Sequence, residues 1–141
     1  MRILLSIVAI VLLASCSRNS SAQNIDVSKT DVENEFIRKH DFLLAMYSDS
    51  YFPSHLVKKA ESTLLKLCYR IESQNIKSLE DFYFLTHQTT KEFNELQNVF
   101  IENGSELETV ARESIAMEFT FIAESYGFDA DLEYMIAPRD W

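Results

Sequence analysis

Residues 53–73 read PSHLVKKAESTLLKLCYRIES, and this stretch decides the fold class. Its apolar residues recur at steps of one, three or four, which places them on one face of an α-helix. They are Leu56, Val57, Ala60, Leu64, Leu67, Cys68 and Ile71. Pro53 suits a helix start, because its missing N–H leaves no bond unmade there. The pattern predicts a helix over residues 53–73 that buries one side.

A helix is also expected before this stretch, over residues 32–48. Asp31 is its expected N-cap, since a side-chain oxygen at that position can accept from the first free N–H groups. The expected inner stripe is Phe36, Leu43, Met46 and Tyr47. Residues 48–52 then break the pattern.

A third helix is predicted to begin after Ser78 and to end at Asn103 and Gly104. Ser78 can cap it, with Asp81 standing in for the usual Glu or Gln of a capping box. Glycine suits the left-handed position that follows a helix. The expected inner face is Leu79, Phe82, Tyr83, Phe93, Leu96 and Phe100.

A fourth helix is expected to follow directly, because Ser105 and Glu108 have the spacing of a full capping box. Gly127 should stop it, and Asp129 should cap a short last helix that runs to about residue 136. The expected inner residues of the fourth helix are Leu107, Val110, Ala111, Ile115, Phe119 and Ile122.

Composition agrees with a helical fold. The chain has only two glycines and two prolines, fewer than a sheet protein with many tight turns needs. We found no internal repeat and no extended alternating pattern. Short links between helices favour antiparallel neighbours, so the sequence predicts an all-α, compact bundle of about four to five helices.

The start of the chain has the pattern of a secretory signal. Met1 and Arg2 precede an apolar run of about a dozen residues, whereas a membrane-spanning helix needs roughly 20. The run ends Leu13-Ala14-Ser15-Cys16, which resembles the lipobox of bacterial lipoproteins. The resemblance implies cleavage before Cys16 and lipid on its sulfur. Two or three acyl chains would anchor the protein stably to a membrane.

These features divide the chain into three parts. Residues 1–15 form the expected lipoprotein signal, residues 16–30 the lipidated cysteine and a polar tether, and residues 31–141 the helical domain. Ser17 follows the cysteine, where Asp would resemble an inner-membrane retention signal. The expected location is therefore the cell envelope, at the outer membrane facing the periplasm if the host is Gram-negative.

Charge narrows the class of partner. The formal net charge is −9, so the chain repels phosphate backbones, and nucleic acid is not an expected partner. A basic protein would be attracted. The chain has two cysteines, and lipid on Cys16 leaves Cys68 without a disulfide partner. Cys68 is expected to be a buried core residue.

The clearest polar stripe is on the third predicted helix. Thr86, Thr90 and Asn94 share a face at steps of four, and His87 lies beside them. The stripe could mark a pocket or an interface, or the groups could bond to backbone and to neighbouring helices. Arg112 follows Glu108 by four and is expected to pair with it.

The last residue, Trp141, carries a large apolar ring beside the terminal carboxylate. It could fold back onto the bundle, with Arg139 or Asp140 pairing nearby, or contribute to a ligand site. No histidine lies in a Glu-x-x-His pair and no cysteine–histidine cluster has ligand spacing, so neither a metal nor a cofactor is expected.

Several runs resemble a family of small bacterial proteins known only as a domain of unknown function. They are Asp41-Phe42-Leu43, Met46-Tyr47, Tyr51-Phe52-Pro53, Leu85-Thr86-His87, Glu108-Thr109-Val110-Ala111-Arg112 and Arg139-Asp140-Trp141. The resemblance covers residues 41–141 and implies an all-helical domain without implying an activity. Members of that family mostly begin near the Asp-Phe-Leu run and lack the lipoprotein signal found here.

Two functions remain open from the sequence. The first is a non-enzymatic, membrane-anchored module that binds a protein partner, such as an immunity or adaptor protein; an acidic protein captures basic partners quickly. The alternative is a small-ligand protein or an enzyme with a pocket near Thr86, His87, Thr90, Asn94 and Arg112.

Overall fold

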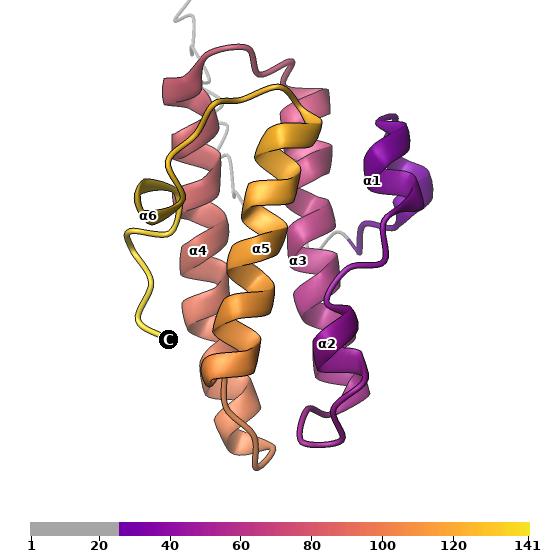
Figure 1. Cartoon of the computed structure of the whole chain (residues 1–141), viewed down its shortest axis with the longest axis vertical. Helices are drawn as coiled ribbons and strands as arrows, with labels where there is room; N and C mark the ends of the chain where they lie inside the picture. The colour runs from indigo at the N-terminus through magenta and orange to yellow at the C-terminus, as the bar shows by residue number, and fades with distance from the viewer. Residues whose placement is uncertain (1–25) are drawn as a thin grey trace, which may run out of the picture.

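Three long helices lie side by side at the centre of the computed structural model, which describes residues 26–141 (Figure 1). They are α3 (Ser54–Ser73), α4 (Leu79–Glu102) and α5 (Thr109–Ser125). Short links make each helix antiparallel to the next. The described residues contain no strand, which confirms the predicted all-α bundle. The expected signal segment, Cys16 and residues 17–25 lie outside the described residues.

The predicted helix over residues 53–73 is confirmed almost to the residue. All seven apolar positions expected on its inner face are buried, Cys68 among them. They pack against buried aromatic residues of the neighbouring helices. The largest of these are Phe82, Phe93 and Phe100 of α4 and Phe119 of α5. Burying a side chain of this size contributes roughly 1.5–3 kcal/mol, so this layer is the main source of stability.

The single helix expected over residues 32–48 is wrong. The chain forms two short helices instead, α1 (Glu35–Lys39) and α2 (Leu44–Tyr47), separated by a turn in which Leu43 has a φ of 54°. Leu43 and Met46 are buried as expected, but Phe36 is 71% exposed and Tyr47 is also exposed. Phe42 and Leu43, at the break, are both buried in the core.

Three helix ends share one geometry. After α3, α4 and α5 the chain turns through a residue with positive φ, namely Asn75, Gly104 and Gly127. Each turn closes with an N–H that reaches back to a carbonyl in the last turn, as in Ser105 N to Phe100 O at 3.0 Å. This is the Schellman motif. The predicted stops at Gly104 and Gly127 are confirmed.

Three of the expected N-caps are wrong, because other side chains are better placed. Asn34 caps α1, whereas Asp31 lies in a short 3-10 helix, η1 (Lys29–Asp31), and accepts from the backbone of Ser28. Asp131, not Asp129, caps the last helix, α6 (Leu132–Met135). The capping box expected at Ser105 and Glu108 does not form, and α5 begins at Thr109 without a side-chain cap.

Some expected core positions are also wrong. Leu79 and Val110 are exposed, and each lies in the first turn of its helix. Tyr83 is half-buried at the edge of the core. The remaining residues of the two predicted inner faces are buried.

Two peripheral segments cover opposite flanks of the three central helices (Figure 1). We call residues 26–53 the N-terminal arm; it carries η1, α1 and α2 and lies against α3 and α5. We call residues 126–141 the C-terminal strap; it crosses the end of the bundle and places α6 beside α4. Val27 is buried, so residues 26–30, expected as part of the tether, belong to the folded arm.

Candidate binding groove

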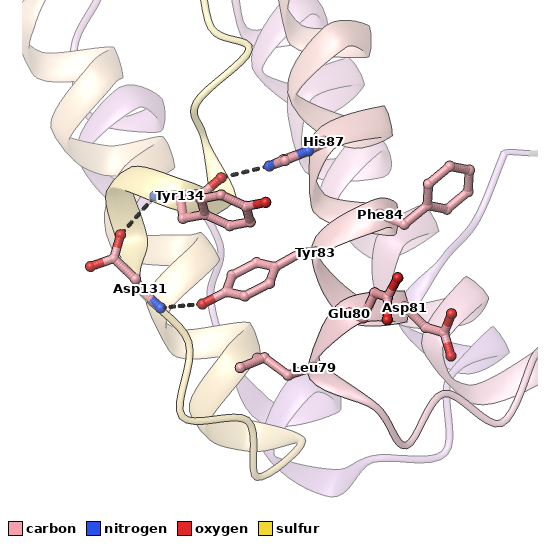
Figure 2. Close-up of a pocket in the computed structure, with 8 residues that line it drawn as sticks. All are labelled: Leu79, Glu80, Asp81, Tyr83, Phe84, His87, Asp131 and Tyr134. Atoms are coloured by element: carbon pink, nitrogen blue, oxygen red, sulfur yellow. Dashed lines mark hydrogen bonds between the residues drawn. The ribbon is translucent and has the colours of Figure 1, made fainter.

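A groove of about 780 Å³ lies between the first half of α4 and the C-terminal strap (Figure 2). Residues of α4 form one wall, and α6 with its cap forms the other. The lining residues are Leu79, Glu80, Asp81, Tyr83, Phe84, His87, Asp131 and Tyr134. Of the residues singled out from the sequence as candidate site residues, only His87 lines this groove.

The groove residues of α4 fall into two rows at helical spacing. Leu79, Tyr83 and His87 follow one another at steps of four and therefore share one face of the helix. Glu80 and Phe84 form a second, adjacent row with the same spacing. From Leu79 to His87 this face extends about 12 Å along the helix axis at 1.5 Å per residue.

Hydrogen bonds fix the second wall to the first (Figure 2). The backbone N–H of Asp131 donates to the Tyr83 hydroxyl at 2.8 Å, and the Asp131 carboxylate accepts from Tyr134 N at 2.8 Å. The His87 Nε2–H donates to the Tyr134 carbonyl oxygen at 2.6 Å. These bonds hold α6, a helix too short to be stable alone, at a defined distance from α4.

The groove combines aromatic rings with carboxylates. The Tyr83 and Tyr134 rings meet edge to face with centroids 4.5 Å apart, and the Phe84 ring is 63% exposed. Glu80, Asp81 and Asp131 contribute acidic groups, and the lining that residues 26–141 provide includes neither lysine nor arginine. A surface of this kind attracts cations, because the carboxylates and the faces of the rings both carry negative potential.

The predicted polar stripe on α4 holds the C-terminal strap. Thr90 Oγ1 donates to Thr86 O at 2.8 Å and lies 3.3 Å from Met135 O. Asn94 donates to Pro138 O at 2.9 Å and accepts from Asp140 N at 3.1 Å. Thr86 is buried and donates to a carbonyl of its own helix. The sequence left two interpretations of this stripe open. The structure agrees with the second, in which the polar groups bond to backbone and to neighbouring segments.

The other two candidate residues lie apart. Trp141 folds back onto the bundle, where it is 5% exposed and packs against Phe93 with ring centroids 6.0 Å apart. Arg139 pairs with Glu133 at 3.3 Å. Arg112 is exposed on α5, and the ion pair expected with Glu108 does not form among the described residues, since Glu108 precedes the helix as its N-cap residue.

Sequence reasoning missed three glutamates that hold the N-terminal arm. Glu118 accepts from Leu43 N and from the His40 ring, each at 2.7 Å. Glu61 accepts from the Tyr47 hydroxyl at 2.7 Å. A signal was present, because both glutamates fall at helical steps among core positions of their own helices.

The third of these, Glu72, joins the arm to the end of α5. Its carboxylate accepts from the backbone N–H groups of Glu33 at 2.6 Å and Asn34 at 3.0 Å, and from the Tyr126 hydroxyl at 2.6 Å. Burial, together with the negative charge of Glu72, raises the pKa of the Cys68 thiol well above its usual range. Burial likewise raises the pKa of Tyr126. Cys68 is thus a protonated core residue at neutral pH.

Two kinds of feature are missing from residues 26–141. None of the helices there combines the length and the apolar character needed to cross a membrane. Within the same part of the chain, histidine, cysteine and carboxylate side chains nowhere gather in the groups of three or more that could hold a metal ion.

Comparison with known families identifies the domain. The model of a family of unknown function, DUF5713, matches residues 36–141, which include the groove, the strap and the runs that suggested a family resemblance. No curated protein and no solved structure is significantly similar to the chain.

Proposed function

The chain belongs to the DUF5713 family of unknown function, and we propose that it is a lipid-anchored, non-enzymatic module of the cell envelope that binds a partner protein through the groove between α4 and α6. The observation that carries the proposal is the composition of this groove. It exposes aromatic rings beside carboxylates, and its walls are held in place by hydrogen bonds. Exposed aromatic side chains on a rigid support are typical of protein-binding surfaces.

The sequence at the start of the chain supports the proposed lipid anchor. The run Leu13-Ala14-Ser15-Cys16 resembles a lipobox, and the folded arm includes Val27. About ten residues separate Cys16 from the first described residue, and such a length spans at most about 35 Å when fully extended. Lipid on Cys16 would therefore keep the start of the folded domain within about 35 Å of a membrane surface, in the compartment where the partner is expected.

Groove binding is tested by a matched pair of variants of the full chain expressed in its native host. Phe84 and Met117 are both strongly exposed, at 63% and 72%, but Met117 lies on α5 and does not line the groove. Partners are cross-linked in cells, identified by mass spectrometry and then rebound in purified form. Phe84→Ala should weaken binding of the purified partner about 10-fold or more, as loss of an exposed aromatic anchor does.

Met117→Ala is the control variant, because it changes an exposed residue outside the groove. Met117→Ala should bind the same partner as tightly as the unchanged chain. Equal loss in both variants, or no loss in either, would place the interface outside the groove and refute the proposed site. Thermal unfolding of both variants should match that of the parent, since each changes an exposed side chain.

Anchoring is tested separately by labelling cells with radioactive palmitate. The full chain should take up the label and fractionate with membranes, and Cys16→Ser should do neither. Cys68→Ser is the matched control, because it removes the other cysteine and leaves the lipobox intact. Label that persists in Cys16→Ser would show that lipid is attached elsewhere or not through this motif.

A further inference from the structure

We propose that the groove binds a basic segment of the partner and holds an arginine or lysine side chain between its aromatic rings and its carboxylates. This inference rests on the proposed function and names the chemistry of the occupant.

Charge favours a cationic occupant. Glu80, Asp81 and Asp131 line the groove, all three are exposed, and the lining residues within the described part of the chain include no basic side chain. Asp81 and Asp131 already accept internal bonds, from Ser78 Oγ and Tyr134 N. Glu80 has no hydrogen-bond or ion-pair partner within residues 26–141, so its carboxylate is free to receive a cation.

The rings favour arginine in particular. Tyr134 and Phe84 are 54% and 63% exposed, and both line the groove. A guanidinium group can stack flat on an aromatic face while its N–H groups donate to a neighbouring carboxylate. Glu80 and Phe84 are four residues apart on α4, so ring and carboxylate lie on one face, as such binding requires.

Shape favours a segment of a protein over a small amine. Small-molecule sites enclose most of their ligand, whereas this groove is open along α4 (Figure 2). Its face of about 12 Å has the length of roughly four residues of extended chain at 3.3 Å per residue. A short basic stretch could therefore lie along α4 with one side chain pointing between the walls.

The test uses the full chain in detergent micelles and peptides of defined chemistry. One peptide alternates arginine with glycine and serine. A second replaces each arginine by citrulline, which keeps the shape and removes the charge. Binding is measured by calorimetry at low and at physiological salt, and spermidine serves as the small-amine probe. The arginine peptide should bind about 10-fold or more tightly than the citrulline peptide, and salt should weaken it.

Variants of the protein test whether the arginine peptide binds in the groove. Glu80→Gln should weaken the arginine peptide about 2- to 5-fold, as expected for an exposed ion pair, and Phe84→Ala about 5-fold or more. Glu113→Gln and Met117→Ala are the matched controls on α5, where both residues are exposed and outside the groove, and they should change nothing. Asp81 and Asp131 are left intact because they take part in helix caps.

Four results would overturn the inference. Equal affinity for the two peptides would remove the role of charge, and equal losses in the α5 variants would remove the role of the groove. Spermidine binding as tightly as the arginine peptide would make the groove a small-amine site. If neither peptide binds while Phe84→Ala still abolishes binding of the purified partner, the basic occupant is wrong and the protein-binding function stands.

Discussion

Individual carboxylates decide how the N-terminal arm is attached. Glu118 is 7% exposed and accepts from Leu43 N at 2.7 Å, where the backbone has its positive φ. Its second oxygen accepts from His40, whose ring stacks on Phe121 with centroids 3.9 Å apart. A left-handed leucine costs about 1–2 kcal/mol. The bond to a buried carboxylate offsets that cost, which is why the break between α1 and α2 persists.

Glu118→Ala should therefore destabilise the fold by about 3 kcal/mol, since it leaves the Leu43 N–H and the His40 ring without their acceptor. Urea unfolding would measure the loss. Amide exchange should also accelerate at Leu43 before it accelerates in α3. Glu113→Ala, on the exposed side of the same helix, should stay within about 0.5 kcal/mol of the parent. Similar losses in both variants would show that Glu118 has no special role.

At the scale of elements, the C-terminal strap is held from both ends. His87 binds the carbonyl of Tyr134 in α6, and Asn94 binds the backbone on either side of Arg139. Trp141, at the end of the strap, packs against Phe93 in the core. Since α6 forms a wall of the groove, the strap links the last residue of the chain to the shape of the proposed binding site.

Trp141→Ala should destabilise the protein by about 3–5 kcal/mol, the usual cost of removing a buried aromatic side chain. Trp141→Phe should cost less, about 1–2 kcal/mol, because the indole Nε1 has no hydrogen-bond partner among the residues that the structure describes, so its loss breaks no bond there. Thermal unfolding would give both values, and the Asp140 amide should exchange faster in the alanine variant. Equal losses in the two variants would imply that Nε1 has a partner.

At the scale of the whole molecule, two tyrosine hydroxyls bind glutamates of α3 from other parts of the chain: Tyr47 donates to Glu61 and Tyr126 donates to Glu72. Burial raises the pKa of Tyr126 and of Tyr47, and the neighbouring Glu72 and Glu61 raise these values further. The unfolded chain ionises its tyrosines near pH 10. Because the folded pKa values are the higher ones, the stability contributed by these groups is fully present below about pH 10. It is lost as the pH rises further towards the folded values.

Unfolding free energy should therefore change little between about pH 7 and pH 9 on account of these groups and fall above about pH 10. Tyr126→Phe should show a smaller alkaline loss than the parent, whereas Tyr69→Phe, which changes an exposed residue, should keep the full loss. Urea unfolding at each pH, with tyrosinate absorbance, would measure both. Ionisation of all six tyrosines near pH 10 in the folded protein would contradict this prediction.

Most of the helical architecture could be predicted from the sequence, because the interactions that specify it are local. The inner face of α3 follows from spacing alone, and the stops at Gly104 and Gly127 follow from the left-handed turn that glycine accepts. Ser78 caps α4 as predicted, with its side chain accepting from Asp81 N. Each of these features depends on residues within one or two turns of one another.

Only the tertiary structure decided the break in the N-terminal arm and the groove. Glu118 and Leu43 are separated by 75 positions in the sequence, and His87 and Tyr134 by 47. No local pattern specifies such pairs, because they form only when packed helices bring them together. The sequence by itself determined an all-α bundle and its buried faces. Long-range packing decided which polar groups of residues 26–141 bind distant segments, as Glu118 does, and which, such as Glu80, have no partner in that part of the chain.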